Sequence, residues 1–564
     1  MSNHAHSHAY VPPTIPIVVQ VGFAGSRNLF NASQHHDLDP ADLEAQAFER
    51  LLERLVELRV KLGLCDQHVL CGISQIAVGA DTLFTRACEK LGIAQRVLLP
   101  QNRDDFLSAV GPDGVRDFSP AEETAARELL RSPHIIEERV VSHARDRDTR
   151  FEEANSAIVH ESDVILCLVR DGARGKPGGT EDLIVRAEIV RKPVVTLGVS
   201  INAGKVTLDE LPPTIPWTEA TDEGPPTMPA ELAGLQIGIL GDIGKWPPAE
   251  TYIGAIKNHA SERSKKHGIG FRNFANVIIG CHVAATLLAI IVGKLPLTFH
   301  GDELLPGSTL ILALLVGEIM LLITGAGHHY ALHHGGRVGK LVSNRLIAEI
   351  MRSLTRIGTA RGDFKYVFLL PVPQKFEPVL RTCDILLLRN APYADGKAWA
   401  ARRDNYVRER LTDPISGQIS YYGSRALKAE RHLFFATFAF WFFTILAVLM
   451  ATAELYLGIR EVGNRDLAAA ISLPQSLIPS GVLNALAAFF PVVAVGALSW
   501  AAASDLHGRA QTFAEMQKFL EDQLRRFSAA ASEREFVELV RETETRLLSE
   551  NLNWYWRRAF ATVG

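Results

Sequence analysis

Three glycine-rich segments carry residue types that bind phosphate, and each follows an apolar run typical of a buried strand. They read GFAGSR at 22–27, GAD at 79–81 and GKPGGTE at 175–181. Glycines let backbone N–H groups approach an anion closely, and a helix that begins there adds a favourable dipole. The serine hydroxyl and the guanidinium of the first segment are further phosphate ligands. One such turn is weak evidence, because glycines often serve only the turn, but three together predict an anion site.

The elements that position these segments alternate between strand and helix. The sequence predicts strands at 15–23, 68–73, 96–100, 163–169 and 194–199, and helices at 40–62, 79–91, 120–130, 149–161 and 180–190. Such alternation predicts an α/β, Rossmann-like domain with a doubly wound parallel sheet. Ligands of these sheets bind beyond the carboxyl ends of the strands, which is where the glycine-rich segments fall.

The order and spacing of these motifs resemble the SLOG superfamily, which includes LOG phosphoribohydrolases, DprA-like proteins and the ligand-binding domain of melastatin-type TRP channels. The matching segments are GFAGSR, GADTLFTRACEKLGIAQRVLLP and RFEEANSAIVHESDVILCLVRDG with GGTED, within about residues 15–200. The resemblance implies a domain that binds a nucleotide or a nucleotide derivative. The predicted binding residues are Gly25, Ser26, Arg27, Ser74, Gly79, Asp81, Arg147, Gly178, Gly179, Thr180 and Glu181.

The third segment departs from the pattern of the hydrolytic LOG enzymes, PGGxGTxxE. This chain reads PGGTEDL, so that Leu183 stands where the acidic residue is expected. Glu181 or Asp182 is then the substitute acid, and Arg147 or Arg150 the accompanying cation. A catalytic acid or base must lie within hydrogen-bond reach of the proton it moves. We therefore favour a binding domain, with a membrane-anchored nucleotide N-glycosidase or phosphoribohydrolase using Glu181 and Arg150 as the alternative.

The second half of the chain contains four apolar stretches long enough to cross a bilayer. They lie at about 274–293, 310–326, 433–453 and 482–503. Lys and Arg cluster before the first and third stretches and after the second and fourth, which predicts a multi-pass protein of the inner or cell membrane with both termini in the cytoplasm. Glu318 lies inside the second stretch, where a carboxylate is costly. It is either a pore residue or is protonated or hydrogen-bonded to a neighbouring helix.

Residues 255–560 resemble the two-helix SLATT membrane effector modules that accompany SLOG sensors in bacterial conflict systems. The resemblance implies a membrane effector that alters permeability, as a pore or by disruption, in antiphage defence. Four spans with one carboxylate offer little material for a pore in one chain, so we expect a homo-oligomer. A solute transporter is disfavoured, because a midplane site needs broken helices or several polar residues.

Composition limits the remaining possibilities. The 564-residue chain has a net charge of −4 and 47% hydrophobic residues, which gives no reason to expect a nucleic-acid partner. Its six cysteines form no CxxC pair, which favours free thiols in a reducing compartment. The expected partners are the lipid bilayer and a nucleotide-derived small molecule, with no metal site and no cofactor.

The predicted organisation has seven parts. They are a disordered tail at 1–14, the SLOG-like domain at 15–205, a Pro-rich linker at 206–256, a first membrane hairpin at 257–345, a cytoplasmic connecting region at 346–431, a second membrane hairpin at 432–504 and cytoplasmic amphipathic helices at 505–564.

Overall fold

The computed structural model shows a chain of two compact units. It describes residues 16–30, 39–111, 114, 116–170, 178–212, 225–235, 248–293, 299–300, 303–304, 306–334, 337–360, 365–390, 399–461 and 480–560. The sheet unit comprises Met1–His259 and Val367–Gly396, and the helical unit comprises Ala260–Tyr366 and Lys397–Gly564. The predicted tail at 1–14 lies outside the described residues, as do 213–224 and 236–247 of the predicted linker.

The described residues of the sheet unit form a seven-stranded sheet in the order β4-β3-β2-β1-β5-β6-β7. Its strands are β1 (Ile17–Gly25), β2 (His68–Ser74), β3 (Ala94–Leu99), β4 (Ile135–Val140), β5 (Val164–Arg170), β6 (Val194–Asn202) and β7 (Lys205–Glu210). All neighbours pair in parallel except β6 and β7, which are antiparallel. The predicted α/β sheet is thus confirmed as mostly parallel, with β4 and β7 as additional edge strands.

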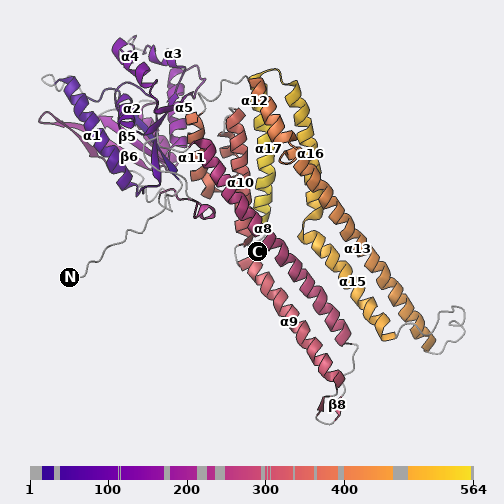
Figure 1. The fold of residues 1–564 in the computed structure, drawn as a ribbon. Helices are drawn as coiled ribbons and strands as arrows, with labels where there is room; N and C mark the ends of the chain where they lie inside the picture. The colour runs from indigo at the N-terminus through magenta and orange to yellow at the C-terminus, as the bar shows by residue number, and fades with distance from the viewer. Residues whose placement is uncertain are drawn as a thin grey trace, which may run out of the picture. The chain divides into compact units, whose positions relative to one another are not determined.

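Helices cover both faces of this sheet (Figure 1). They are α1 (Pro40–Lys61), α2 (Ala80–Lys90), α3 (Arg103–Leu107), α4 (Pro120–Leu129), α5 (Arg147–Glu161), α6 (Thr180–Ile189) and α11 (Glu377–Asn390), with short 3₁₀ turns at Ala230–Leu232, Lys365–Leu369 and Gln374–Phe376. Polar side chains start several of these helices. Asp39 caps α1 and Asp146 caps α5, so that first-turn N–H groups have an acceptor.

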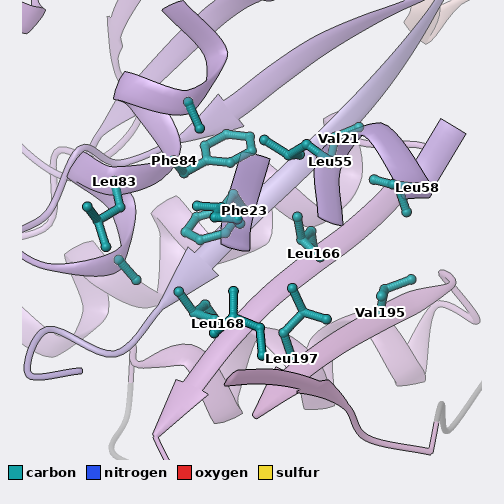
Figure 2. Close-up of a cluster of buried hydrophobic side chains, with 14 of the residues drawn as sticks. Val21, Phe23, Leu55, Leu58, Leu83, Phe84, Leu166, Leu168, Val195 and Leu197 are labelled. Carbon is teal, nitrogen blue, oxygen red and sulfur yellow. The ribbon is translucent and has the colours of Figure 1, made fainter. Parts of the chain in front are cut away.

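The larger core cluster lies between the sheet and helices α1 and α2. Figure 2 shows Phe23 of β1 beside Phe84 of α2, and their rings stack at a centroid distance of 4.2 Å with an interplanar angle of 5°. Leu55 and Leu58 of α1 complete this layer, each at most 3% exposed. Because β1 is buried along almost its whole length, its residues are apolar without alternation, except for the buried Gln20.

Helix α11 comes from a distant part of the sequence yet packs on β1. The backbone N–H of Val18 donates to the Thr382 hydroxyl at 3.0 Å, and Arg381 forms an ion pair with Asp163, which precedes β5. The Tyr252 hydroxyl donates to the carbonyl of Pro16 at 2.9 Å. These contacts lie at the amino end of the sheet, opposite the edge where its ligands would bind.

The described residues of the helical unit are almost entirely α-helical. Its helices are α8 (Ala249–Val292, which begins in the sheet unit), α9 (Pro306–His334), α10 (Arg337–Ala360), α12 (Trp399–Tyr406), the π-helical turn η5 (Val407–Thr412), α13 (Gln418–Glu461), α15 (Ser480–Ala503), α16 (Leu506–Ala529) and α17 (Glu533–Phe560). A two-stranded pair, β8 (Phe299–His300) and β9 (Glu303–Leu304), precedes α9.

Among the described residues, three helical segments are long and apolar enough to cross a membrane: Leu310–Ala331, Gln418–Ala453 and Asn484–Ala529. They overlap three of the four predicted spans and indicate a multi-pass membrane protein. The remaining prediction, at 274–293, corresponds to a shorter apolar helical segment, Asn276–Val292. Large apolar side chains point outward from these helices, including Phe434 and Trp441, which are 66% and 59% exposed. A lipid environment would cover such surfaces.

Candidate functional site

The candidate site lies where the strand order reverses. From β1 the chain proceeds to β2 on one side, and it later returns to β5 on the other. Ligands of open α/β sheets bind in the crevice at such a switch point. Ser26 follows β1 here: its N–H donates to the Leu168 carbonyl at 2.9 Å, and its hydroxyl accepts the N–H of Arg170 at 3.1 Å. Ser26 therefore keeps its own hydroxyl proton available for a further acceptor.

Two glycines allow β1 and α2 to meet at this edge. Gly79 has a φ of +89°, and a Cβ placed there would lie 2.1 Å from the carbonyl oxygen of Arg27. A Cβ at Gly25 would lie 2.2 Å from that of Ala80. Both positions therefore exclude a side chain. Gly79 is also the N-cap of α2, and because glycine has no side chain to cap a helix, it leaves first-turn N–H groups for another acceptor.

Asp81 supports this loop from within. Its side chain is 4% exposed and accepts the N–H of Ala77 at 3.3 Å. Burial raises the pKa of Asp81 to about 7, although backbone N–H groups of Ala77, Gln75 and Gly25 stabilise the charged form. The predicted binding residue Asp81 thus holds together the loops that carry Gly25 and Gly79.

Two predicted arginines converge on an aspartate that sequence reasoning missed. Nη1 of Arg27 lies 2.8 Å from Oδ1 of Asp117, and the Arg147 guanidinium donates to the other oxygen of that carboxylate. Both guanidiniums also face the Phe151 ring, at 5.7 and 5.5 Å from its centroid. Asp117 is 9% exposed, whereas the side chains of Arg27 and Arg147 are 39% and 27% exposed. We call these three residues the Arg-Asp-Arg cluster; its net charge is positive.

The third glycine-rich segment lies against the same residue, Phe151. Gly178 has a φ of +70°, and a Cβ there would lie 2.5 Å from the Cβ of Phe151. Gly179 is the N-cap of α6, which begins at Thr180. Helix α6 thus starts beside the helix that carries Arg147, again without a side-chain cap. Residues 171–177, which include the first part of the glycine-rich segment, lie outside the described residues.

A buried amide joins two of the segments. Asn155 is 1% exposed; its amide nitrogen donates to the Gly179 carbonyl and to Asp182, both at 3.0 Å. Its carbonyl oxygen accepts from the Gln75 side chain at 2.9 Å. Asn155 therefore ties the loop after β2 to the start of α6. The signal in the sequence that could have indicated Asn155 was its polar side chain at a position close to Ala154 and Ile158, which are buried in α5.

The remaining predicted residues lie in different surroundings. Ser74 is fully buried, and its hydroxyl accepts from Gln95 at 2.8 Å. Glu181 is exposed. Within the described part of the chain it forms no hydrogen bond or ion pair, either with Arg150 or with another residue. Asp182 pairs with Arg186 at 2.8 Å. Glu181 and Arg150, the proposed hydrolytic pair, are therefore not in direct contact.

Two further predictions concern the membrane segment and metals. Glu318 is half-buried within the apolar part of α9. Over the described residues, no group of three or more His, Cys, Asp or Glu side chains is placed to hold a metal ion. Comparison with models of known protein families and with curated proteins finds no match to this sequence.

Proposed function

We propose that the sheet unit binds a nucleotide or a nucleotide derivative at the carboxyl edge of β1 and β5. The observation that carries the proposal is the Arg-Asp-Arg cluster, in which Arg27 and Arg147 converge beside two glycine-started helices, α2 and α6. Guanidiniums and helix N-termini both favour phosphate oxygens. The motif resemblance to the SLOG superfamily supports the same ligand class.

We further propose that this binding controls membrane permeability through the helical unit, as in SLATT-type effectors of antiphage defence. The long apolar helices support an output in the bilayer. A ligand can shift this output only if it binds two states with different affinity. Glu318 is the proposed pore residue of a homo-oligomer, with both termini in the cytoplasm. A carboxylate in an apolar helix is best accommodated in a bundle interior or beside water.

The test uses the full chain in lipid nanodiscs, because α11, far along the sequence, is part of the sheet unit. The protein is incubated with a panel of linear, cyclic and NAD-derived nucleotides, and mass spectrometry records what is retained and whether it is altered. We expect an intact nucleotide that is retained by the wild type and lost in Arg27→Ala. Arg50→Ala is the matched control, since Arg50 is exposed on α1 and, among the described residues, pairs with Glu53 alone.

The retained nucleotide is then added to liposomes that contain the protein and a trapped dye. Dye release that requires both the nucleotide and Arg27 would support the proposed effector. Retention without release would contradict the membrane output while leaving the binding site intact. Released base or ribose phosphate would instead identify a hydrolase, and loss of that turnover in Glu181→Ala would favour the alternative function.

A further inference from the structure

A cysteine and a histidine face each other across the turn that leads into β2. The carbonyl of Cys65 accepts the backbone N–H of His68 at 2.9 Å, which closes a β-turn over the sequence CDQH. This turn places Sγ of Cys65 at 3.2 Å from Nδ1 of His68. Arg59 of α1 supports the end of the turn, because its guanidinium donates to the His68 carbonyl at 3.0 Å. The thiol and the imidazole therefore meet on a well-supported piece of backbone.

Two hydrogen bonds fix the position of the proton on the His68 ring. Nε2 lies 2.8 Å from the carbonyl oxygen of Pro226, and because a carbonyl can only accept, Nε2 carries the proton. Nδ1 accepts the backbone N–H of Cys65 at 3.1 Å, which requires an unprotonated Nδ1. Both contacts give the same neutral tautomer, in which the lone pair of Nδ1 lies beside the cysteine sulfur.

The two residues differ in exposure as a nucleophile and its base do. Cys65 is exposed, whereas His68 is 3% exposed and is held by the Pro226 carbonyl. A thiol attacks as its thiolate, and a base that is itself oriented by a third group is the arrangement that produces one. The other five cysteines are buried: Cys71, Cys88, Cys167, Cys281 and Cys383. In the folded chain, Cys65 is therefore the sulfur that a dissolved reagent can reach.

This pair lies apart from the candidate nucleotide site. His68 is the first residue of β2 and pairs with Ile17 at the start of β1. The candidate site lies beyond the carboxyl ends of β1 and β5. Because β1 and β2 run parallel, the pair and the candidate site are at opposite edges of the sheet. The thiol and the imidazole are therefore no part of the proposed nucleotide site.

We propose that Cys65 and His68 form a site of reversible thiol–disulfide exchange, at which a small disulfide, R–S–S–R, modifies Cys65. The other cysteines are buried, so the partner sulfur comes from outside the chain. Sγ of Cys65 attacks one sulfur of the reagent, a new S–S bond forms, the old one breaks, and R–S⁻ leaves with the electron pair. Cys65 is oxidised and the reagent is reduced by the same two electrons.

His68 moves the proton in this reaction. Its Nδ1 takes the thiol proton as Sγ attacks and gives it to the leaving sulfur, so that the products are the mixed disulfide and R–SH. While Nδ1 holds the proton, the Pro226 carbonyl still accepts from Nε2. The backbone N–H of Cys65 loses its acceptor for this time, and because Cys65 is exposed, water takes the place of Nδ1.

The test uses the full chain in nanodiscs and dithiodipyridine, a neutral disulfide whose leaving thiol is measured by its absorbance. One thiol per chain should react quickly in the folded protein, and all six should react after denaturation. Peptide mapping by mass spectrometry should place the fast modification on Cys65, and Cys65→Ser should abolish the fast phase. Addition of dithiothreitol should remove the label completely, as expected for a mixed disulfide.

The role of His68 is tested with His68→Gln, which keeps an amide N–H for the Pro226 carbonyl but places no base beside the sulfur. An exposed cysteine without a base is only a few per cent thiolate at pH 7, so complete ionisation raises the reactive fraction by at most about 30-fold. The lower nucleophilicity of a more acidic thiol reduces this gain. We therefore expect His68→Gln to react roughly 10-fold more slowly at pH 7. At about pH 9.5 a thiol ionises without help, so the two rates should converge.

Two further measurements keep this result specific. His160→Gln removes an exposed histidine at the end of α5 and should react as the wild type does. A short peptide that contains cysteine but no histidine should react roughly 10-fold more slowly than wild-type Cys65 at pH 7, a comparison that does not depend on how any variant folds. If His68→Gln were partly unfolded, more than one thiol would react quickly, so the thiol count monitors its folding.

Three results would overturn the proposal. One is a wild-type Cys65 that reacts no faster at pH 7 than the peptide. Another is equal reaction rates for the wild type and His68→Gln at pH 7, which would show that the imidazole takes no proton from the thiol. The third is a slower reaction of His68→Gln that persists at about pH 9.5, which would make His68 a structural support of the turn.

Discussion

Replacing Asp117 by asparagine should strengthen nucleotide binding rather than weaken it. The Asp117 carboxylate occupies both guanidiniums that are proposed to bind the ligand phosphate. A phosphate that engages Arg27 and Arg147 must therefore compete with an anion already in place. Asparagine has nearly the same shape but no charge, so both arginines become more available.

The expected size of the effect follows from the exposure of the partners. Arg27 and Arg147 are 39% and 27% exposed, so solvent screens both ion pairs. Each pair is then worth about 1 kcal/mol, near the upper end for ion pairs at a surface. Loss of both pairs amounts to about 2 kcal/mol, or roughly a 30-fold lower Kd. The free protein should become less stable by a similar amount, because the two guanidiniums then lack their counter-ion.

The assay is calorimetric titration of the full chain in nanodiscs with pyrophosphate and with ADP, at two salt concentrations. Glu123→Gln is the matched control, because Glu123 of α4 pairs with Arg127 of the same helix and with Arg116, which precedes it, and forms an ion pair with neither Arg27 nor Arg147. Weaker binding in Asp117→Asn, as expected for Arg27→Ala, would refute the reasoning. It would show that Asp117 positions the arginines for the ligand instead of competing with it.

Three further predictions concern stability, measured by thermal unfolding of the full chain in nanodiscs. Burial raises the pKa of Asp81 from 3.8 to about 7, so the stability contributed by its protonated carboxyl is fully present below pH 3.8 and is lost as the pH rises through about 7. Asp81→Asn should therefore flatten the dependence of stability on pH between these two values. An unchanged pH dependence would contradict the raised pKa of Asp81. Arg410 and Glu544 form a pair that is 2% and 0% exposed, so Glu544→Gln should cost about 3–5 kcal/mol, and much less if Arg410→Met is combined with Glu544→Leu. Phe84→Ala should cost about 3–5 kcal/mol, whereas a loss below about 1 kcal/mol would mean that the core refills the space.

The sequence pattern predicts the central parallel strands well but the edge strands of the sheet poorly. Strands such as β1 are buried on both faces and read as nearly continuous apolar runs, which in β1 only Gln20 interrupts. By contrast, β4 reads IIEERV, with Glu137 and Glu138 in its middle, and was not predicted as a strand. The strand accommodates the charge of Glu137 because this carboxylate pairs with the buried Arg96 of β3 at 2.7 Å. From the sequence pattern alone, a charged residue whose partner lies on a neighbouring strand cannot be distinguished from a charged residue in a loop.

The glycine-rich segments and the arginines of the candidate site were visible in the sequence, but Asp117 was not. It follows no strand and belongs to no motif. Its place depends on its neighbour Phe118, which is 1% exposed and packs edge-on against Phe106 at a centroid distance of 5.5 Å. Tertiary packing of an irregular segment therefore brings the carboxylate to Arg27, and local sequence patterns do not encode such a contact.

Strand β1 connects the candidate site to the start of α8. Its carboxyl end carries Ser26 and Arg27, while its amino end begins after Pro16, whose carbonyl accepts the Tyr252 hydroxyl. Tyr252 lies in the first turn of α8, and this single helix continues to the apolar segment Asn276–Val292. Under the proposed function, a ligand that shifted β1 would act on the first turn of the helix that continues to Asn276–Val292. Such coupling would require the ligand to bind two states of the chain with different affinity.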